Sequence, residues 1–287
     1  MIIVRIKCGL GNQLFQYAAA WALSKRLKQP FALFLSASDG RAFRLDQLNV
    51  SVKTVVKLED MSQEFEVMNN PHVNNALTKL GISKHQFGDW LYFKQLKDEF
   101  QEDFFVVKAE NIYLDGFFQC EAYFKEYRTD LLRQFISVDL KEPGYEQTVS
   151  KIEKCNSVAV HVRRGDFQVS EHPFHYLLTE GYYRKAFAYI RERIESPVFF
   201  WFSEDYEWIY ETFGHEKDFY FTGNPSVNGD IIDIMLMKNC KHIITANSTF
   251  SWWAAWLNEH KDAIRIVPDK QYITEGSIPD SWIKLTV

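Results

Sequence analysis

From residue 157 onward, short apolar runs alternate regularly with segments of helical character. We expect strands at 157–163, 197–203, 218–221, 241–245 and 263–267, with helices at 181–194, 205–213, 230–239 and 249–257 between them. This alternation is typical of a parallel β-sheet that is covered by helices on both faces. Ligands of such sheets bind beyond the carboxyl ends of the strands, so the polar residues that follow the strands are the candidates for function.

The first half of the chain begins in a similar way. A strand at 2–7 leads through a turn at Gly9, Leu10 and Gly11 into a helix at 13–27, for which Asn12 is the expected N-cap. Further strands are expected at 31–35 and 112–118 and a helix at 121–135, whereas 51–110 predicts only short helices. Pro143-Gly144 marks a linker. Since domains commonly hold roughly 100–150 residues, we expect two α/β domains, 1–150 and 151–287.

The strand at 157–163 ends in a cluster of charged side chains. Because side chains alternate along a strand, His161 and Arg163 share one face, while Arg164 can turn elsewhere. Two guanidinium groups at the mouth of a sheet suit a phosphate or diphosphate, which arginine binds bidentately. The alternative is that both arginines pair with Asp166 and only fix the loop.

Polar residues also follow the other strands of the second half. Ser203 and Asp205 come after 197–202, and Asn247, Ser248 and Thr249 open a helix, whose N-terminus is a favourable anion site. Asp205 and Ser248 could instead act only as helix N-caps. Asp233, near the start of an apolar helix, could either contact a ligand or only stabilise the helix dipole.

Several functional classes are excluded by the sequence. Leu14 stands where a dinucleotide fingerprint needs its third glycine, and no Gly-Lys-Ser/Thr follows. No Asp-x-Asp, Cys-x-x-Cys or His-Glu-x-x-His occurs, so we expect no metal and no cofactor. A net charge of −5 gives no overall basic field for nucleic acid.

The four cysteines are widely spaced and are expected to be reduced. The start of the chain reads directly as a strand without a leader, and no apolar run of about 20 residues is present. We therefore expect a cytoplasmic protein, with peripheral contact at the inner membrane left open.

Three motifs together resemble one enzyme family. They are Gly9–Tyr17 (GLGNQLFQY), the His-x-Arg-Arg-x-Asp of residues 161–166, and Asn247–Trp256 (NSTFSWWAAW). In this order and spacing they are similar to the bacterial α1,2-fucosyltransferases of glycosyltransferase family 11. The resemblance implies a GT-B-like fold, with two Rossmann-like domains facing a cleft.

The resemblance also implies the reaction. The enzyme would be an inverting, metal-independent galactoside 2-α-L-fucosyltransferase that moves L-fucose from GDP-β-L-fucose to the 2-hydroxyl of a terminal galactose on a glycan. A different linkage, acceptor or GDP-sugar is an alternative, as is a non-catalytic module that binds glycans or nucleotides.

Site residues follow from the motifs. The second domain would bind GDP-fucose through His161, Arg163, Arg164, Ser203, Asp205, Asp233, Asn247, Ser248, Thr249 and Phe250, while Gly9, Gly11, Asn12 and Gln13 would line the acceptor side. Arg163 would stabilise the leaving diphosphate. Asp166 ranks first as general base and Glu171 second, since Glu171 matches the position of a proposed base in α1,6-fucosyltransferases. Trp252, Trp253 and Trp256 are expected in the core.

Overall fold

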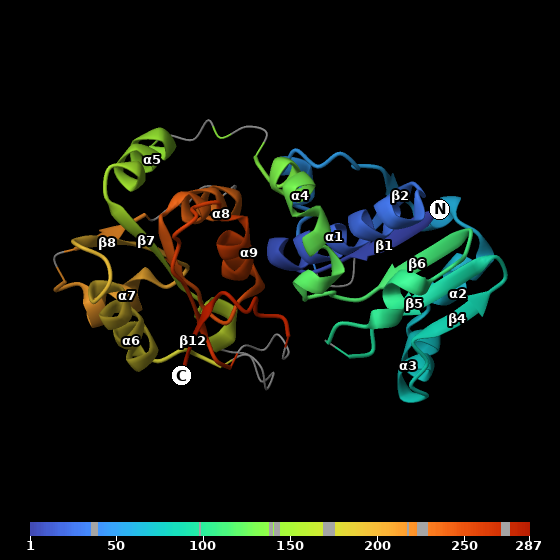
Figure 1. Ribbon diagram of the computed structural model, residues 1–287. Helices are drawn as coiled ribbons and strands as arrows, with labels where there is room; N and C mark the ends of the chain where they lie inside the picture. Colours follow the sequence, from blue (N-terminus) through green and yellow to red (C-terminus); the bar gives the residue numbers. More distant parts are fainter. Residues whose placement is uncertain are drawn as a thin grey trace. The chain divides into compact units, whose positions relative to one another are not determined.

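The computed structural model describes residues 1–35, 40–97, 99–137, 140, 144–168, 176–216, 218–222, 229–270 and 276–287, except for the side chain of Asp166. The chain splits into two compact units (Figure 1). The first comprises Met1–Ile136 and Thr274–Ile278, and the second comprises Ser137–Ile273 and Pro279–Val287. Within the described residues, no helix combines the length and the apolar character needed to cross a membrane.

A six-stranded sheet forms the centre of the first unit. Its strands are β1 (Ile2–Ile6), β2 (Phe31–Leu35), β3 (Val55–Val56), β4 (Lys84–Phe87), β5 (Trp90–Lys94) and β6 (Asn111–Asp115), in the order β3-β2-β1-β6-β5-β4. All neighbours are parallel except the β4–β5 hairpin. The chain leaves β1 toward one edge and returns on its other side at β6. This reversal makes the ends of β1 and β6 the topological switch point of the sheet.

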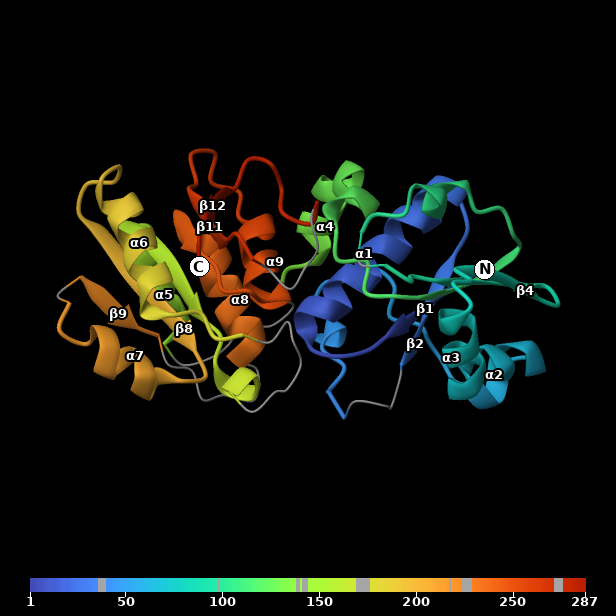
Figure 2. The ribbon, with the colours of Figure 1, turned by 90° about the horizontal axis from the view of Figure 1, so that it is seen from below.

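Helices cover both faces of this sheet (Figure 2). They are α1 (Leu10–Leu27), α2 (Gln63–Asn69), α3 (Pro71–Lys79) and α4 (Arg128–Gln134), with short 3-10 turns at Leu45–Gln47, Leu58–Asp60, Glu102–Val106, Glu121–Tyr123 and Lys125–Tyr127. Most of α1 is buried, and Tyr17 donates a hydrogen bond to Gln134 of α4. On the opposite face, α2 and α3 pack over Ile3, Tyr92 and Tyr113.

The sheet of the second unit is entirely parallel. It contains β7 (Asn156–Val162), β8 (Pro197–Ser203), β9 (Phe219–Phe221), β10 (His242–Ile244), β11 (Arg265–Pro268) and β12 (Ile283–Leu285), in the order β12-β11-β10-β7-β8-β9. Its helices are α5 (Tyr145–Glu153), α6 (Glu180–Arg191), α7 (Tyr206–Phe213), α8 (Gly229–Asn239) and α9 (Thr249–Leu257), with a 3-10 turn at Gly165–Gln168. The strand order reverses between β7 and β10, which is the switch point of this unit.

The core of the second unit explains its many aromatic residues. Val158, Val160 and Trp201 pack under α6 and α7. Trp252, Trp253 and Trp256 of α9 are also buried, which confirms that they belong to the core. Both units are α/β structures with entirely or mainly parallel sheets, and the predicted GT-B-like class with two Rossmann-like domains is confirmed.

The structure corrects several sequence-based expectations. Helix α1 begins at Leu10 with Gly9 as its N-cap, so Leu10 and Gly11 are helical and Asn12 is not the cap. The Gly9 carbonyl accepts from the amides of Asn12 and Gln13, which starts the helix three residues early. The helix expected at 121–135 consists of two 3-10 turns followed by α4. The hairpin β4–β5, strand β12 and helix α5 were not expected.

The boundary between the units also differs from the predicted position. It lies between Ile136 and Ser137, and not at 150, because α5 packs on β7 and α8 of the second unit. A short segment near the C-terminus, ending at Ile278, belongs to the first unit. The sequence carries no signal for this return of the chain.

Candidate functional site

His161 lies near the carboxyl end of β7, at the switch point of the second unit. The ring is buried and lies 5.4 Å, centroid to centroid, from that of Phe250. Burial, and to a smaller extent the charge of Arg163, lowers the pKa of His161 to about 3. His161 is therefore neutral at pH 7, and its Nδ1 has no hydrogen-bond partner among the described residues.

Arg163 follows β7 and forms an ion pair with Glu204, which follows β8. Its Nη1 donates to a carboxylate oxygen of Glu204, and its guanidinium lies 5.5 Å from the ring centroid of Phe167. A Cβ at Gly165 would lie 2.5 Å from the second oxygen of Glu204, so the Glu204 carboxylate would have to shift if this residue carried a side chain. The Glu204 side chain is 54% exposed, against 20% for Arg163. The pair thus lies at the surface of the site.

Arg164 has a different environment. Its Nε donates to Asp205 Oδ2 at 2.9 Å, and its guanidinium lies 4.4 Å from the ring centroid of Trp208. Asp205 Oδ2 also accepts from Gln168 at 2.8 Å, while its Oδ1 accepts from the Trp208 amide and caps α7. Ser203 Oγ accepts from the Asp205 amide at 2.9 Å. Arg164 therefore ties the loop after β7 to the start of α7.

The N-terminus of α9 lies next to the end of β7, because β10 and β7 are neighbours. Ser248 Oγ accepts from the Phe250 amide at 3.3 Å and so caps the helix, while Thr249 is buried in its first turn. Asn247 donates to the Tyr176 carbonyl at 2.9 Å. Its buried Oδ1 has no partner in the part of the chain that the structure describes.

Asp233 of α8 belongs to the same edge. Burial raises its pKa to about 7, and the charges of Asp230 and Glu204 contribute. Its Oδ1 is buried and finds no hydrogen-bond donor within the described ranges. Helix α8 leads into β10 of this parallel sheet, so the first turns of the helix, which hold Asp233, lie at the carboxyl edge of the strands.

Two of the expected residues lie outside what the structure describes. They are Glu171 and the side chain of Asp166. Glu204, the partner of Arg163, was expected on the same edge as Arg163 together with Ser203 and Asp205, but no role was assigned to it. Thr245 was missed: its buried Oγ1 has no partner among the residues described, and its position next to β7 could have drawn attention to it.

The expected acceptor-side residues lie at the start of α1 in the first unit. Asn12 Oδ1 accepts from Gln119 at 2.7 Å. Gln13 is buried; its Nε2 donates to the carbonyls of Cys8 and Ala42, both at 2.8 Å, and its Oε1 accepts from the Arg44 amide. Gln13 thus joins α1 to the loop that precedes the first 3-10 turn.

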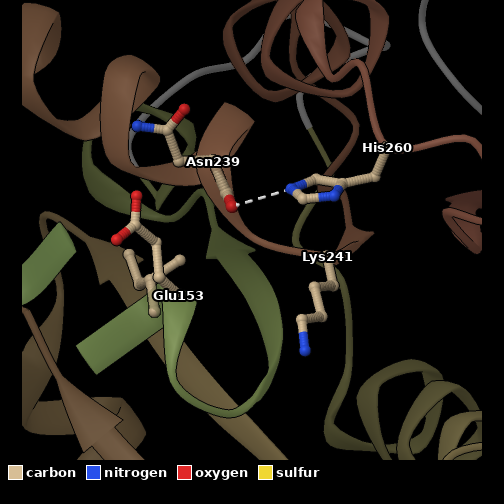
Figure 3. Close-up of a pocket in the computed structure, with 5 residues that line it drawn as sticks. Glu153, Asn239, Lys241 and His260 are labelled. Carbon is tan, nitrogen blue, oxygen red and sulfur yellow. Dashed lines mark hydrogen bonds between the residues drawn. The ribbon is translucent and has the colours of Figure 1, made fainter. Parts of the chain in front are cut away.

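A small pocket lies away from these residues. It has a volume of about 210 Å³ and is lined by Ile152, Glu153, Asn239, Lys241 and His260 (Figure 3). A ring nitrogen of His260 lies 3.2 Å from the Asn239 carbonyl oxygen. Lys241 precedes β10, so the pocket lies at the amino ends of the strands.

The described residues contain no group of three or more His, Cys, Asp or Glu that could hold a metal ion.

Comparison with known families identifies the chain. The model of Glycosyl transferase family 11 matches residues 1–283. The chain belongs to glycosyltransferase family 11. The family 11 chain is 33% identical over 298 residues to the O-antigen biosynthesis glycosyltransferase WbnK of Escherichia coli, covering 96% of this chain and 98% of WbnK. It is 32% identical over 303 residues to an alpha-1,2-colitosyltransferase of Escherichia coli, covering 99% of both chains.

Solved structures share the fold of this family 11 protein at low sequence identity. The NodZ alpha-1,6-fucosyltransferase soaked with GDP-fucose has a TM-score of 0.50 at 15% identity, over 89% of this chain and 91% of NodZ. A mutant of Arabidopsis thaliana FUT1 in complex with GDP has a TM-score of 0.51 at 13% identity, over 97% of this chain and 72% of that chain. These similarities support the fold and not the identity of the ligand.

Proposed function

We propose that this family 11 glycosyltransferase moves L-fucose from GDP-β-L-fucose to the 2-hydroxyl of a terminal galactose, with inversion and without a metal ion. The observation that carries the proposal is the place of Arg163: it pairs with the largely exposed carboxylate of Glu204, beside the N-terminus of α9 at a topological switch point. Such an edge offers a diphosphate both a guanidinium and helix amides.

In this proposal the second unit binds the donor. Arg163 releases Glu204, whose exposed side chain can turn into solvent. Its guanidinium then donates hydrogen bonds to the diphosphate instead. Charge builds on the diphosphate as the bond to fucose breaks, so a guanidinium held in place binds the transition state more tightly than the ground state. Ser248 and Thr249 offer their hydroxyls and the amides of the first turn of α9 to the same group.

The remaining polar atoms of this edge suit the nucleoside. Asp233 Oδ1 and Asn247 Oδ1 are buried acceptors without donors among the described residues. Because an unpaired buried acceptor is costly, a ligand N–H or O–H that reaches it gains binding energy. We assign these two atoms to the guanine or ribose, whereas Asp205 already accepts from three donors and holds Arg164 and α7 in place.

Asp166 remains our first choice as general base, and Glu171 the second. Asp166→Asn and Glu171→Gln should be compared for turnover, with GDP binding as the control. The base variant loses turnover and keeps GDP binding. A variant that loses both has a structural role.

One comparison favours a different sugar nucleotide as the donor substrate. The alpha-1,2-colitosyltransferase of Escherichia coli aligns with 99% of this chain. Competition between GDP-fucose and GDP-colitose for the same acceptor decides between the two sugars, because the preferred donor gives the higher kcat/KM.

The first unit is assigned to the acceptor, with the start of α1 at Gly9, Gly11, Asn12 and Gln13 on the acceptor side. A terminal β-galactoside is the expected acceptor, and a lipid-linked glycan would bring the enzyme to the membrane surface. Linkage analysis of the product distinguishes an α1,2 bond from other linkages.

The central test is GDP release from GDP-fucose, with and without a β-galactoside, in EDTA. Release that needs the acceptor and continues in EDTA is the expected result. GDP binding without release would indicate a wrong acceptor or a binding module. Loss of GDP binding would refute the assignment of the Arg163 edge.

A further inference from the structure

The first unit has a charged cluster at its own switch point. Lys7 follows β1, while Lys94 and Asp115 end β5 and β6. The register pairs Lys94 with Asp115, and Arg5 of β1 follows the pair Val4–Leu114. These side chains therefore meet at the carboxyl edge of three neighbouring strands, where sheets of this kind bind ligands.

Both carboxylate oxygens of Asp115 have partners inside this cluster. Lys7 Nζ lies 2.9 Å from its Oδ1, and Arg5 Nη1 lies 3.4 Å from its Oδ2. Tyr92 donates its hydroxyl to Oδ2 at 2.9 Å, and Lys94 Nζ lies 3.9 Å from the same oxygen. Asp115 is only 4% exposed. A ligand would therefore meet the cations of the cluster and not its carboxylate.

Lys7 and Lys94 share this single carboxylate within the described chain. Their side chains are 20% and 18% exposed. Among the described residues, Lys94 Nζ has one further polar contact, Asn74 Oδ1 at 3.5 Å. Burial lowers the pKa of Lys94, and the charges of Lys7 and Arg5 act in the same direction against that of Asp115. Each ammonium has three N–H donors, so both retain donors that an oxyanion can accept.

The loop after β6 adds a rigid aromatic side chain. Lys7 Nζ lies 4.7 Å from the ring centroid of Phe117, which is half-buried. Gln95 Oε1 accepts from the amides of Phe117 and Phe118 at 2.8 and 2.7 Å. A Cβ at Gly116 would lie 2.5 Å from Gln95 Cβ, so only glycine fits there. The backbone that carries Phe117 is thus fixed, with its ring beside the Lys7 ammonium, before any ligand arrives.

We propose that Lys7, Lys94 and Phe117 form a binding site for an anionic group of the acceptor glycan, either a sugar carboxylate or a phosphate ester. The inference rests on the proposed function in assigning the first unit to the acceptor. The ammonium groups bind the oxyanion, and the ring contacts the adjacent sugar. The site selects among acceptors and does not take part in bond making.

The test compares three β-galactosides whose aglycone is a neutral methyl group, a uronate or a phosphate ester. KM is measured by GDP release, and direct binding without donor is measured by calorimetry. We expect the wild type to favour one or both anionic acceptors by about tenfold, with the preference falling as salt rises. The acceptor that is favoured identifies the carboxylate or the phosphate as the recognised group.

Variants connect the preference to the residues. Lys94→Met should abolish the preference in both KM and calorimetric affinity, and Lys94→Arg should restore it. Lys7→Met is the second test variant, and thermal melting verifies that each variant is folded. Lys57→Met is the matched control, because Lys57 of the same unit is 71% exposed and should leave the preference intact.

Two outcomes overturn the inference: equal binding of all three galactosides by the wild type, or a preference that survives both Lys94→Met and Lys7→Met. Failure of the proposed function looks different, since no galactoside then promotes GDP release. Calorimetry decides on the anion site in that case as well.

Discussion

Replacing each of the two adjacent arginines by lysine should separate catalysis from architecture. Lysine keeps the charge and loses the planar fork that binds two oxygens at once. If Arg163 stabilises the leaving diphosphate, Arg163→Lys should lower kcat by about 100- to 1000-fold, the usual effect of removing one such donor. Its partner Glu204 is 54% exposed, so solvent screens the pair and this ion pair contributes about 0–1 kcal/mol to folding stability.

Arg164→Lys should instead lower the stability of the fold more than it lowers kcat. It removes the 2.9 Å hydrogen bond from Nε to Asp205 and the stacking on Trp208. A hydrogen bond to a charged group contributes about 1.5–3 kcal/mol and a cation–π contact about 0.5–1 kcal/mol. At about 2–4 °C per kcal/mol, the melting temperature should fall by several degrees.

Three measurements on the same preparations test this pair of predictions. They are kcat for acceptor-dependent GDP release, the calorimetric affinity for GDP and the melting temperature. The reasoning is refuted if Arg163→Lys turns over within a few-fold of the wild type. It is equally refuted if Arg163→Lys melts as early as Arg164→Lys, because Arg163 would then be the architectural residue.

Three further predictions concern the carboxylate side chains of Asp233, Asp115 and Glu204. The pKa of Asp233 is raised to about 7 from its ordinary 3.8, so its folded form holds the proton more tightly and stability is lost as pH rises from about 4 through 7. Asp233→Asn should therefore be more stable than the wild type at pH 8, with a difference in unfolding free energy that disappears toward pH 4; a difference independent of pH would contradict this. Asp115→Asn leaves the cations of the first unit without their buried carboxylate and should cost about 3–5 kcal/mol in urea denaturation, well above the effect of Asp103→Asn, whose pair with Lys84 is more exposed. Glu204→Gln removes the competitor for Arg163 and should tighten GDP binding up to about fivefold in calorimetry; weaker binding would mean that Glu204 orients Arg163 in the complex.

The second unit could be predicted well from the sequence because its strands are buried on both faces. A buried strand reads as an apolar run that stops at a polar residue, and 197–203 was predicted with the bounds that β8 has. Helix α9 was predicted with its observed bounds, and the N-cap role that Ser248 has was the alternative to phosphate binding. Polar residues at strand ends therefore identified most of this edge.

The first unit was harder to predict because its short elements depend on distant contacts. Asn12 has the chemistry of an N-cap, yet its side chain binds Gln119, more than 100 residues away. Strand β4 is partly exposed and carries Lys84, His85 and Gln86, so it lacks an apolar run. The clustering of cations around Asp115 was also not predicted, since Arg5 and Lys7 precede Asp115 by more than 100 residues.

The partners of the two arginines illustrate what only the sheet register can decide. Proximity in sequence suggested Asp166 as the ion-pair partner of both arginines. In the sheet, Val162 pairs with Ser203, so Arg163 and Arg164 continue alongside Glu204 and Asp205. One parallel register thus produces two adjacent ion pairs, Arg163–Glu204 and Arg164–Asp205.

These two pairs differ in how easily a diphosphate can replace the carboxylate. Asp205 is 19% exposed and accepts from Arg164, Gln168 and the Trp208 amide, so its departure would break three hydrogen bonds and uncap α7. Glu204 is mostly exposed and can be rehydrated as it leaves. An incoming anion therefore displaces Glu204 at lower cost than Asp205. In the proposed function Arg163 is for this reason the arginine that exchanges its partner for the diphosphate, while Arg164 fixes the loop that carries Arg163.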